Sequence, residues 1–265
     1  MLRDRKAPSE RRRAKGEVDV ALLDVRNVSK SFGAIRAVNN VSFSIEPGEV
    51  VGLMGDNGAG KSTMVKLIAG NFPPTEGEIA VNDEVCHFHK PIEARAKGIE
   101  VVYQDLAIAD NLTAAQNVFL GREIMKGVWP FRILDKQAMI DRSGELFAEL
   151  KSETRPQDLV RKMSGGQRQA VAIARTRLSN AQLVLMDEPT AAISVRQVAE
   201  VLELIHRLKA QGVAVILISH RMPDVFAVCD RIIVLRRGTK VADKITAKTS
   251  PEEITGLITG AILAA

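Results

Sequence analysis

The sequence predicts an α/β fold around a buried parallel sheet, and three observations support this prediction. A strand-like apolar run, 50–54, leads into a glycine-rich loop and then a helical run, 63–69. Two further apolar runs, 183–186 and 213–218, have the unbroken hydrophobicity of strands that are buried on both faces. A helical segment at about 195–209 separates these two runs. Strands that alternate with helices in this way are typical of α/β proteins.

Length and composition fit such a fold. The chain has 265 residues, of which 46% are hydrophobic and 26% are charged. This length accommodates one large α/β domain or two small ones, with enough apolar residues for a sizeable core. The two cysteines, Cys86 and Cys229, are far apart in sequence, which is no disulfide framework and suits a reducing cytosol. We find no secretory signal and no apolar run near the ~20 residues that a spanning helix needs.

Residues 1–19 are predicted to form a basic, disordered tail ahead of a domain at 20–265. Residues 1–16 contain seven Lys or Arg and two acidic residues, a net charge of +5. Because the whole chain also carries +5, the remaining residues are neutral together. Contact of the tail with anionic lipid or nucleic acid is the alternative to a solvated leader.

Short strands open the domain, and a helical insertion follows them. The strands are expected at 20–28, 41–45, 78–81 and 99–103, and the helices of the insertion at 111–120 and 135–151. Phe32 lies in a loop between the first two strands, where an aromatic ring either stacks on a base or packs in the ordinary way. Asp135 is the expected N-cap of the second helix, and 127–130 is expected to be a loop. A closing hairpin at 231–241 and a helix at 254–265 are expected to end the chain.

The loop after residue 54 matches the phosphate-binding pattern G-x-x-x-x-G-K-[ST]. It consists of Gly55, Asp56, Asn57, Gly58, Ala59, Gly60, Lys61, Ser62 and Thr63. Its glycines let backbone N–H groups turn toward a phosphate, and the helix that starts at Lys61 adds its positive dipole end. Lys61 supplies a charge for the β and γ phosphates, and Ser62 can ligate Mg²⁺. A chance glycine-rich turn is the alternative, which the flanking strand and helix disfavour.

Polar residues also follow the two later apolar runs. Asp187 is placed to hold Mg²⁺ through water, and Glu188 to accept a proton from the attacking water or to orient it. Ligands of open α/β sheets bind at this end of the strands. His220, after the run 213–218, is therefore either a hydrogen-bond donor to a γ-phosphate or a structural residue.

A second helix start carries an anion-site signature. Ser164 and Gln167 form an S-x-x-Q capping box around Gly165 and Gly166, for a helix that runs to about residue 178. The plain interpretation is a well-capped helix. Free N–H groups and the helix dipole point the same way at such a start, so it is also suited to bind an anion.

In this order the motifs resemble the nucleotide-binding subunit of ABC transporters, over about residues 20–265. The residues in and around these motifs most resemble those of the monosaccharide-uptake branch (ribose, fructose or xylose type). This chain resembles a single-domain form of that branch. Segments 55–58, 103–105, 119–123, 188–192, 218–225 and 255–260 carry that closer likeness. The resemblance implies a P-loop NTPase (RecA-like) core, an N-terminal antiparallel β subdomain and an inserted helical subdomain at about 106–162.

The resemblance also implies roles for single residues. Phe32 would stack on adenine, residues 55–63 would cradle the phosphates, and Gln104 would sense Mg²⁺ and water and connect to the membrane partner. Ser164 and Gly166 would bind the γ-phosphate of ATP held by the other subunit, and Gly165 and Gln167 would belong to the same ATP-binding element. Asp187 would hold Mg²⁺, Glu188 would act as general base, and His220 would stabilise the γ-phosphate. Ser194 stands where the family often has an Asp, so the intersubunit contact of that Asp is not implied here.

The implied function is ATP hydrolysis that powers import of a sugar, such as fructose, ribose or xylose, through a separate permease. The implied cofactors are ATP and Mg²⁺. The implied assembly is a head-to-tail homodimer on the cytoplasmic side of the inner membrane, served indirectly by a periplasmic or extracellular solute-binding protein, with no nucleic acid. Two alternatives remain open: an importer ATPase for a non-sugar solute, and a soluble ABC-type ATPase that acts on nucleic acid or ribosomes. The latter usually has paired domains or long coiled-coil insertions, and this chain shows neither.

Overall fold

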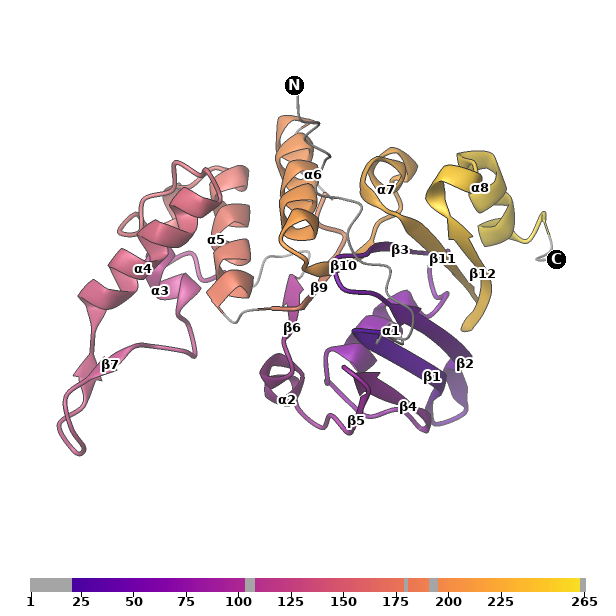
Figure 1. The fold of residues 1–265 in the computed structure, drawn as a ribbon, viewed down its shortest axis with the longest axis horizontal. Helices are drawn as coiled ribbons and strands as arrows, with labels where there is room; N and C mark the ends of the chain where they lie inside the picture. Colours follow the sequence, from indigo (N-terminus) through magenta and orange to yellow (C-terminus); the bar gives the residue numbers. More distant parts are fainter. Residues whose placement is uncertain (1–20, 103–107, 179–180, 191–194, 263–265) are drawn as a thin grey trace, which may run out of the picture.

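The computed structural model describes residues 21–102, 108–178, 181–190 and 195–262, which form two packed sheets and a helical lobe (Figure 1). The larger sheet has six strands in the order β12-β11-β3-β10-β9-β6. Five of them run parallel, and β12 pairs antiparallel with β11 at one edge. These strands are β3 (Val50–Met54), β6 (Ile99–Val102), β9 (Leu183–Asp187), β10 (Ala214–Ile218), β11 (Arg231–Arg236) and β12 (Thr239–Ile245).

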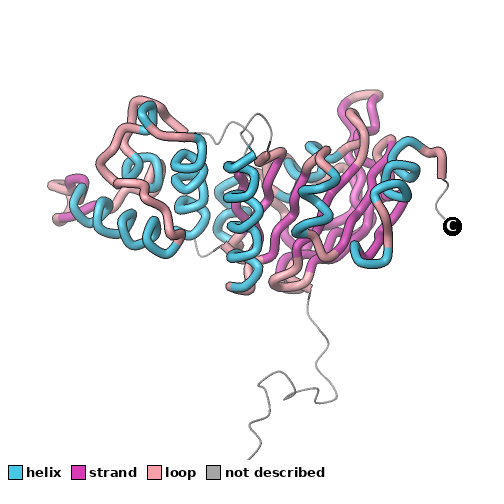
Figure 2. The backbone as a smooth tube through the Cα atoms, turned by 90° about the horizontal axis from the view of Figure 1, so that it is seen from above, coloured by secondary structure: helices cyan, strands magenta, loops and turns pink. Residues whose placement is uncertain are grey.

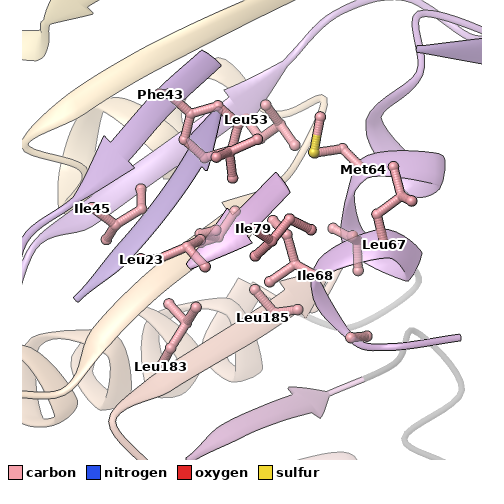
Figure 3. Packing of buried hydrophobic residues seen from close by; sticks show 14 of the residues in the cluster. Leu23, Phe43, Ile45, Leu53, Met64, Leu67, Ile68, Ile79, Leu183 and Leu185 are labelled. Carbon is pink, nitrogen blue, oxygen red and sulfur yellow. The ribbon is translucent and has the colours of Figure 1, made fainter. Parts of the chain in front are cut away.

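The smaller sheet is antiparallel and has the order β2-β1-β4-β5. Its strands are β1 (Leu23–Phe32), β2 (Ile35–Ile45), β4 (Glu76–Val81) and β5 (Glu84–Cys86). Helix α1 (Lys61–Ile68) packs between the two sheets, as Figure 3 shows for Met64, Leu67 and Ile68. Leu23 and Ile79 of the small sheet and Leu185 of the large sheet belong to the same buried cluster. The glycine-rich loop before α1 is thereby anchored to both sheets.

The unbroken apolar runs are explained by burial on both faces of the large sheet. In β9, Leu183 and Leu185 belong to the cluster around α1, whereas Val184 and Met186 belong to a cluster on the opposite face. Successive side chains of a strand point to opposite faces, so a strand covered on both sides must be apolar throughout. The helices of the second face are α5 (Gly165–Leu178), α6 (Val195–Ala210), α7 (Met222–Val228) and α8 (Pro251–Thr259).

A helical lobe lies at one end of the molecule, beyond α6 (Figures 1 and 2). It contains α3 (Ala114–Val118), α4 (Lys136–Glu149) and α5, with a core of its own that includes Val118, Phe147 and Val171. A short hairpin of β7 (Met125–Lys126) and β8 (Ile133–Leu134) joins α3 to α4. Helix α2 (Pro91–Ala96) and the short 3-10 helices Val160–Lys162 and Thr246–Lys248 complete the described elements. None of the described helices combines the length and apolar character needed to cross a membrane.

The predicted fold class is confirmed, and several elements differ in detail. Asp135 caps α4 as expected, accepting a hydrogen bond from the Ala138 N–H at 3.2 Å. Strand β2 begins at Ile35 rather than 41, because it pairs with β1 up to the tight turn between Phe32 and Ile35. The sequence analysis missed β5, α2 and α7, and residues 127–130, expected as a loop, form the turn of the β7–β8 hairpin. The proposed tail, 1–19, lies outside the described residues, so the domain boundaries stay a prediction.

Candidate active site

Three neighbouring parallel strands bring the predicted motifs to one edge of the large sheet. Strand β10 lies between β3 and β9. The loop 55–63 follows β3, Asp187 ends β9 with Glu188 directly after it, and His220 lies two residues beyond β10. Because all three strands run in the same direction, their carboxyl ends lie at one edge of the sheet, which is where ligands of open α/β sheets bind.

Two glycines of the loop 55–63, Gly55 and Gly60, are required by close backbone packing. Gly55 has φ +153°, and a Cβ there would lie 2.3 Å from the carbonyl oxygen of Leu235. Gly60 has φ +101°, and its Cβ would lie 2.7 Å from the carbonyl oxygen of Ala37. Both distances are shorter than any van der Waals contact, so any side chain would displace the loop. These contacts with β11 and β2 constrain the shape of the loop.

Lys61 lies across the mouth of this loop. Its Nζ donates hydrogen bonds to the carbonyl oxygens of Gly55 at 2.6 Å and Asp56 at 2.9 Å. Burial lowers the pKa of Lys61, and the negative charges of Glu188, Asp56 and Asp187 oppose this shift. Gly60, the N-cap of α1, has no side chain to satisfy the first N–H groups of the helix. An uncapped helix start beside a lysine fits a bound phosphate group.

The Asp187 carboxylate, at the end of β9, is partly buried and lies near the charge of Glu188. Burial raises the pKa of Asp187, and the negative charge of Glu188 raises it further. Neighbouring carboxylates of this kind are suited to a divalent cation such as Mg²⁺, and Ser62, in the first turn of α1, is a further candidate oxygen donor. The residues present therefore fit Mg²⁺ bound together with a nucleotide phosphate.

Glu188 is held in an unusual backbone conformation. Its φ is +51°, in the left-handed region, and its N–H donates to the carbonyl oxygen of Ile218 at 2.9 Å. Its side chain turns toward the end of the neighbouring strand, where Oε2 lies 2.8 Å from Nδ1 of His220. The side chain of Glu188 is 19% exposed and that of His220 is 71% exposed. The pair is thus open to a ligand on the histidine side.

The second predicted anion site lies at the start of α5. The Gln167 side chain accepts from the Ser164 N–H at 3.0 Å, and the Gln167 N–H donates to the Ser164 hydroxyl at 3.3 Å, which is the reciprocal capping box. These residues and Gly166 line a cavity of about 690 Å³ between α5 and α6. No residue of the loop 55–63 is among the described residues that line it. Within one chain, the structure does not join the two helix starts.

Glu200 of α6 reaches the start of α5, and the sequence analysis did not single it out. A Cβ on Gly166 would lie 2.2 Å from Oε2 of Glu200, so the carboxylate rests against this glycine. Arg196 pairs with the other carboxylate oxygen at 3.3 Å. Nothing in the local sequence separates Glu200 from an ordinary acidic residue of an exposed helix face. Only the packing of α6 against α5 reveals the contact.

Among the remaining residues that the sequence analysis singled out, the structure describes Phe32. The Phe32 ring is 47% exposed and meets the Phe72 ring edge-on at 5.3 Å, with Nζ of Lys30 5.4 Å from the Phe32 ring centre. Stacking of Phe32 on a base stays a prediction. Gln104 and Ser194 lie outside the described residues.

A mainly parallel sheet with a phosphate-binding loop after one strand and two acidic residues at the end of another defines a P-loop nucleotide hydrolase. Residues 38–191 match the sequence profile of a family described as ABC transporter. The chain belongs to the ABC transporter family, as an ATP-binding cassette.

Three relatives are named as sugar import ATP-binding proteins. The chain is 44% identical, over 90% of its length, to a xylose/arabinose import ATP-binding protein of Sulfolobus acidocaldarius, covering 94% of that protein. It is 44% identical, over 83% of its length, to a fructose import ATP-binding protein of Rhizobium meliloti, covering 86% of it. A ribose import ATP-binding protein of Geobacillus kaustophilus is 40% identical over 90% of this chain, which spans only 48% of that relative.

Solved structures share the fold. A nucleotide-free ATP-binding cassette of an ABC transporter superposes with a TM-score of 0.76 at 24% identity, over 90% of this chain and 95% of that one. A dimeric cassette in a post-hydrolysis state, bound to ADP and Pi, gives a TM-score of 0.68 at 26% identity, over 84% of this chain and 98% of that one. The family and the site together identify the chain as an ATPase.

Proposed function

We propose that this chain is the ATP-hydrolysing subunit of an importer for a monosaccharide and acts through a separate membrane permease. The observation that carries the proposal is end-to-end similarity to a protein named for xylose and arabinose import, at 44% identity and 94% coverage of that relative. A fructose import relative of similar length supports the same class of cargo. The names of these relatives give xylose, arabinose, fructose and ribose as the candidate sugars.

The arrangement of the site supports a separate role for each of its residues in ATP hydrolysis. Lys61 would exchange its two carbonyl partners for the β and γ phosphates of ATP, alongside the free N–H groups at the start of α1. Ser62 and Asp187 would hold Mg²⁺, which neutralises phosphate charge when bound. Glu188 would accept a proton from the attacking water. His220, 71% exposed on its side chain beside Glu188, would donate a hydrogen bond toward the γ-phosphate.

The second helix start supports a composite site between two subunits. Ser164, Gly166 and Gln167 form an anion-suited helix start in the helical lobe, apart from the loop 55–63 of the same chain. A head-to-tail dimer would place this helix start of one subunit against ATP bound to the other. The dimeric cassette bound to ADP and Pi supports the dimer itself for this fold.

The composite site is tested with Glu188→Gln, which keeps the size of the side chain and removes the base. Turnover should fall by roughly 10²–10⁴, and the dimer formed with ATP and Mg²⁺ should persist because hydrolysis no longer separates it. Light scattering measures its mass. If the variant stays monomeric at saturating ATP and Mg²⁺, the composite site is rejected.

The proposed location is the cytoplasmic side of the inner membrane, with the subunit bound to permease subunits. A solute-binding protein on the other side would deliver the sugar, and no nucleic acid takes part. Gln104 would connect the nucleotide site to the permease, and the adjoining helical lobe would move with it on ATP binding, in a hinge-type closure.

Transport is tested in a deletion strain, by labelled-sugar uptake across a panel of monosaccharides. Loss of uptake of one sugar, restored by the wild-type chain but not by Glu188→Gln, supports the proposal. Unchanged sugar uptake with loss of amino-acid or metal-ion uptake would overturn the sugar cargo and leave the ATPase assignment intact.

A further inference from the structure

The hairpin β7–β8 exposes an apolar surface that the nucleotide site does not use. All ten of its residues, 125–134, are exposed. Six of them are large and hydrophobic: Met125, Val128, Trp129, Phe131, Ile133 and Leu134. The three nearest the tip, Val128, Trp129 and Phe131, are 79–84% exposed. Isolated apolar residues are common on protein surfaces, but a contiguous exposed group of this kind marks an interaction site.

The hairpin lies at the far end of the helical lobe in both views of the molecule (Figures 1 and 2). Two ladder pairs, Met125 with Leu134 and Lys126 with Ile133, hold its strands together. None of its residues is among the described residues that form the core of the lobe. The tip therefore projects from the end of the lobe, and none of its residues lines the cavity between α5 and α6.

The charges of the hairpin are all positive. Lys126 and Arg132 flank the tip, Lys136 follows at the start of α4, and residues 125–134 contain no Asp or Glu. Asp135 lies just outside, 3.7 Å from the Lys126 Nζ. Aromatic side chains flanked by Lys and Arg are the residues that anchor proteins at membrane interfaces, with the cations among anionic headgroups.

We propose that residues 125–134 are a membrane-interface anchor, in which Val128, Trp129 and Phe131 enter the headgroup–acyl boundary of an anionic bilayer. From Lys126 to Trp129 an extended chain reaches about 10 Å. That reach fits the ~5–10 Å depth at which interfacial segments bury their apolar side chains. Because the hairpin joins α3 to α4, the anchor would attach the helical lobe directly to the lipid. The inference relies on the proposed function only for the presence of a membrane.

The chain supplies its own probe, because Trp129 is its single tryptophan. The full-length protein is mixed with phosphatidylcholine vesicles, with or without phosphatidylglycerol, and its tryptophan emission and co-sedimentation are measured. We expect a blue shift of the emission and co-sedimentation with the anionic vesicles. Phe131→Ser combined with Val128→Ser should weaken vesicle binding at least about tenfold. Lys126→Gln and Arg132→Gln should each weaken it roughly fivefold.

The matched control is Ile92→Ser, which removes a 69% exposed apolar side chain from α2 and should leave vesicle binding unchanged. Co-sedimentation without a blue shift would mean that another surface, such as the basic tail, binds the vesicles, and would overturn the anchor. A blue shift that grows with protein concentration in the absence of vesicles would assign the hairpin to a second copy of the chain. Equal binding by the double serine variant, or no binding to either vesicle, also rejects the proposal. Since neither ATP nor a permease is present, all of these outcomes leave the proposed transport function untouched.

Discussion

Nδ1 of His220 lies 2.8 Å from Oε2 of Glu188, across the ends of two neighbouring strands. An ionised carboxylate only accepts hydrogen bonds, so the contact assigns the Nδ1 proton to the histidine. Nε2 is then the other ring nitrogen, and it can donate a hydrogen bond to a phosphate only when the imidazole carries a proton on both nitrogens. The contact also orients the Glu188 carboxylate, whose backbone is fixed by its bond to the Ile218 carbonyl oxygen.

His220→Ala should lower ATP turnover on the order of 10²-fold, because it removes one donor and releases the Glu188 carboxylate. ATP affinity and melting temperature should stay near the wild-type values, since the side chain is 71% exposed. Steady-state kinetics and calorimetry test this together. His220→Gln keeps a donor and should retain more activity than the alanine variant. Full activity of His220→Ala would show that the contact with Glu188 has no part in hydrolysis.

Lys61→Ala should abolish tight ATP binding, because the variant lacks the ammonium group that lies across the loop 55–63. Lys97→Ala, which removes a lysine paired with Glu84 outside the loop 55–63, is the matched control and should bind ATP normally. Isothermal calorimetry measures both affinities. Near-normal affinity of Lys61→Ala would refute the assignment of this loop as the phosphate site.

Asp187→Asn should stabilise the nucleotide-free protein while it abolishes Mg²⁺-dependent hydrolysis. Burial and the charge of Glu188 raise the pKa of Asp187 in the folded state, so ionised Asp187 costs folding free energy. This cost is present above the folded-state pKa and disappears as the pH falls through it. Solvent screens part of the repulsion, so the expected gain is roughly 2–4 °C in melting temperature, as for ~1 kcal/mol in a chain of this size.

Thermal scans of both proteins at neutral and at mildly acidic pH measure this difference. The advantage of Asp187→Asn should be largest at neutral pH and should shrink as the buffer becomes acidic. A variant that is less stable than the wild type at neutral pH would contradict the role of burial and of Glu188 at this position.

Glu100→Gln should destabilise the junction between the large sheet and the helical lobe. Glu100 of β6 is 3% exposed, pairs with Arg122 beyond α3, and lies 3.7 Å from Nε of Arg95. Burial lowers the pKa of Arg175 on α5, and the nearby charges of Arg95 and Arg122 lower it further. Loss of the carboxylate would leave these cations facing one another, at a cost of about 2–4 kcal/mol.

Chemical denaturation measures the cost. Glu145→Gln, which removes one partner of the exposed pair with Arg142, is the control and should change stability by less than about 1 kcal/mol. Equal effects of the two substitutions would show that the buried cluster around Glu100 adds nothing to the junction.

Many local elements of this protein could be predicted from short stretches of sequence, because neighbouring residues set the backbone conformation. The loop 55–63, the capping box at Ser164 and Gln167, and the N-cap Asp135 depend on residues a few positions apart, and the structure has each local element where it was expected. The apolar runs of β9 and β10 likewise record burial on two faces.

Tertiary structure alone decided what depends on strand order and on the packing of distant elements. The position of β10 between β3 and β9 brings His220 to Glu188, residues separated by 32 positions in the chain. Glu200 contacts Gly166, and Glu100 is buried at the junction between the large sheet and the helical lobe. Both contacts join elements that are distant in sequence, so no local pattern predicts them. The exposure of the hairpin 125–134 could be established only from the fold. An apolar segment that is exposed to solvent has the same sequence pattern as one that is buried in a core. Hydrophobicity makes burial of a side chain energetically favourable, but the packing of the whole chain determines whether that side chain is buried.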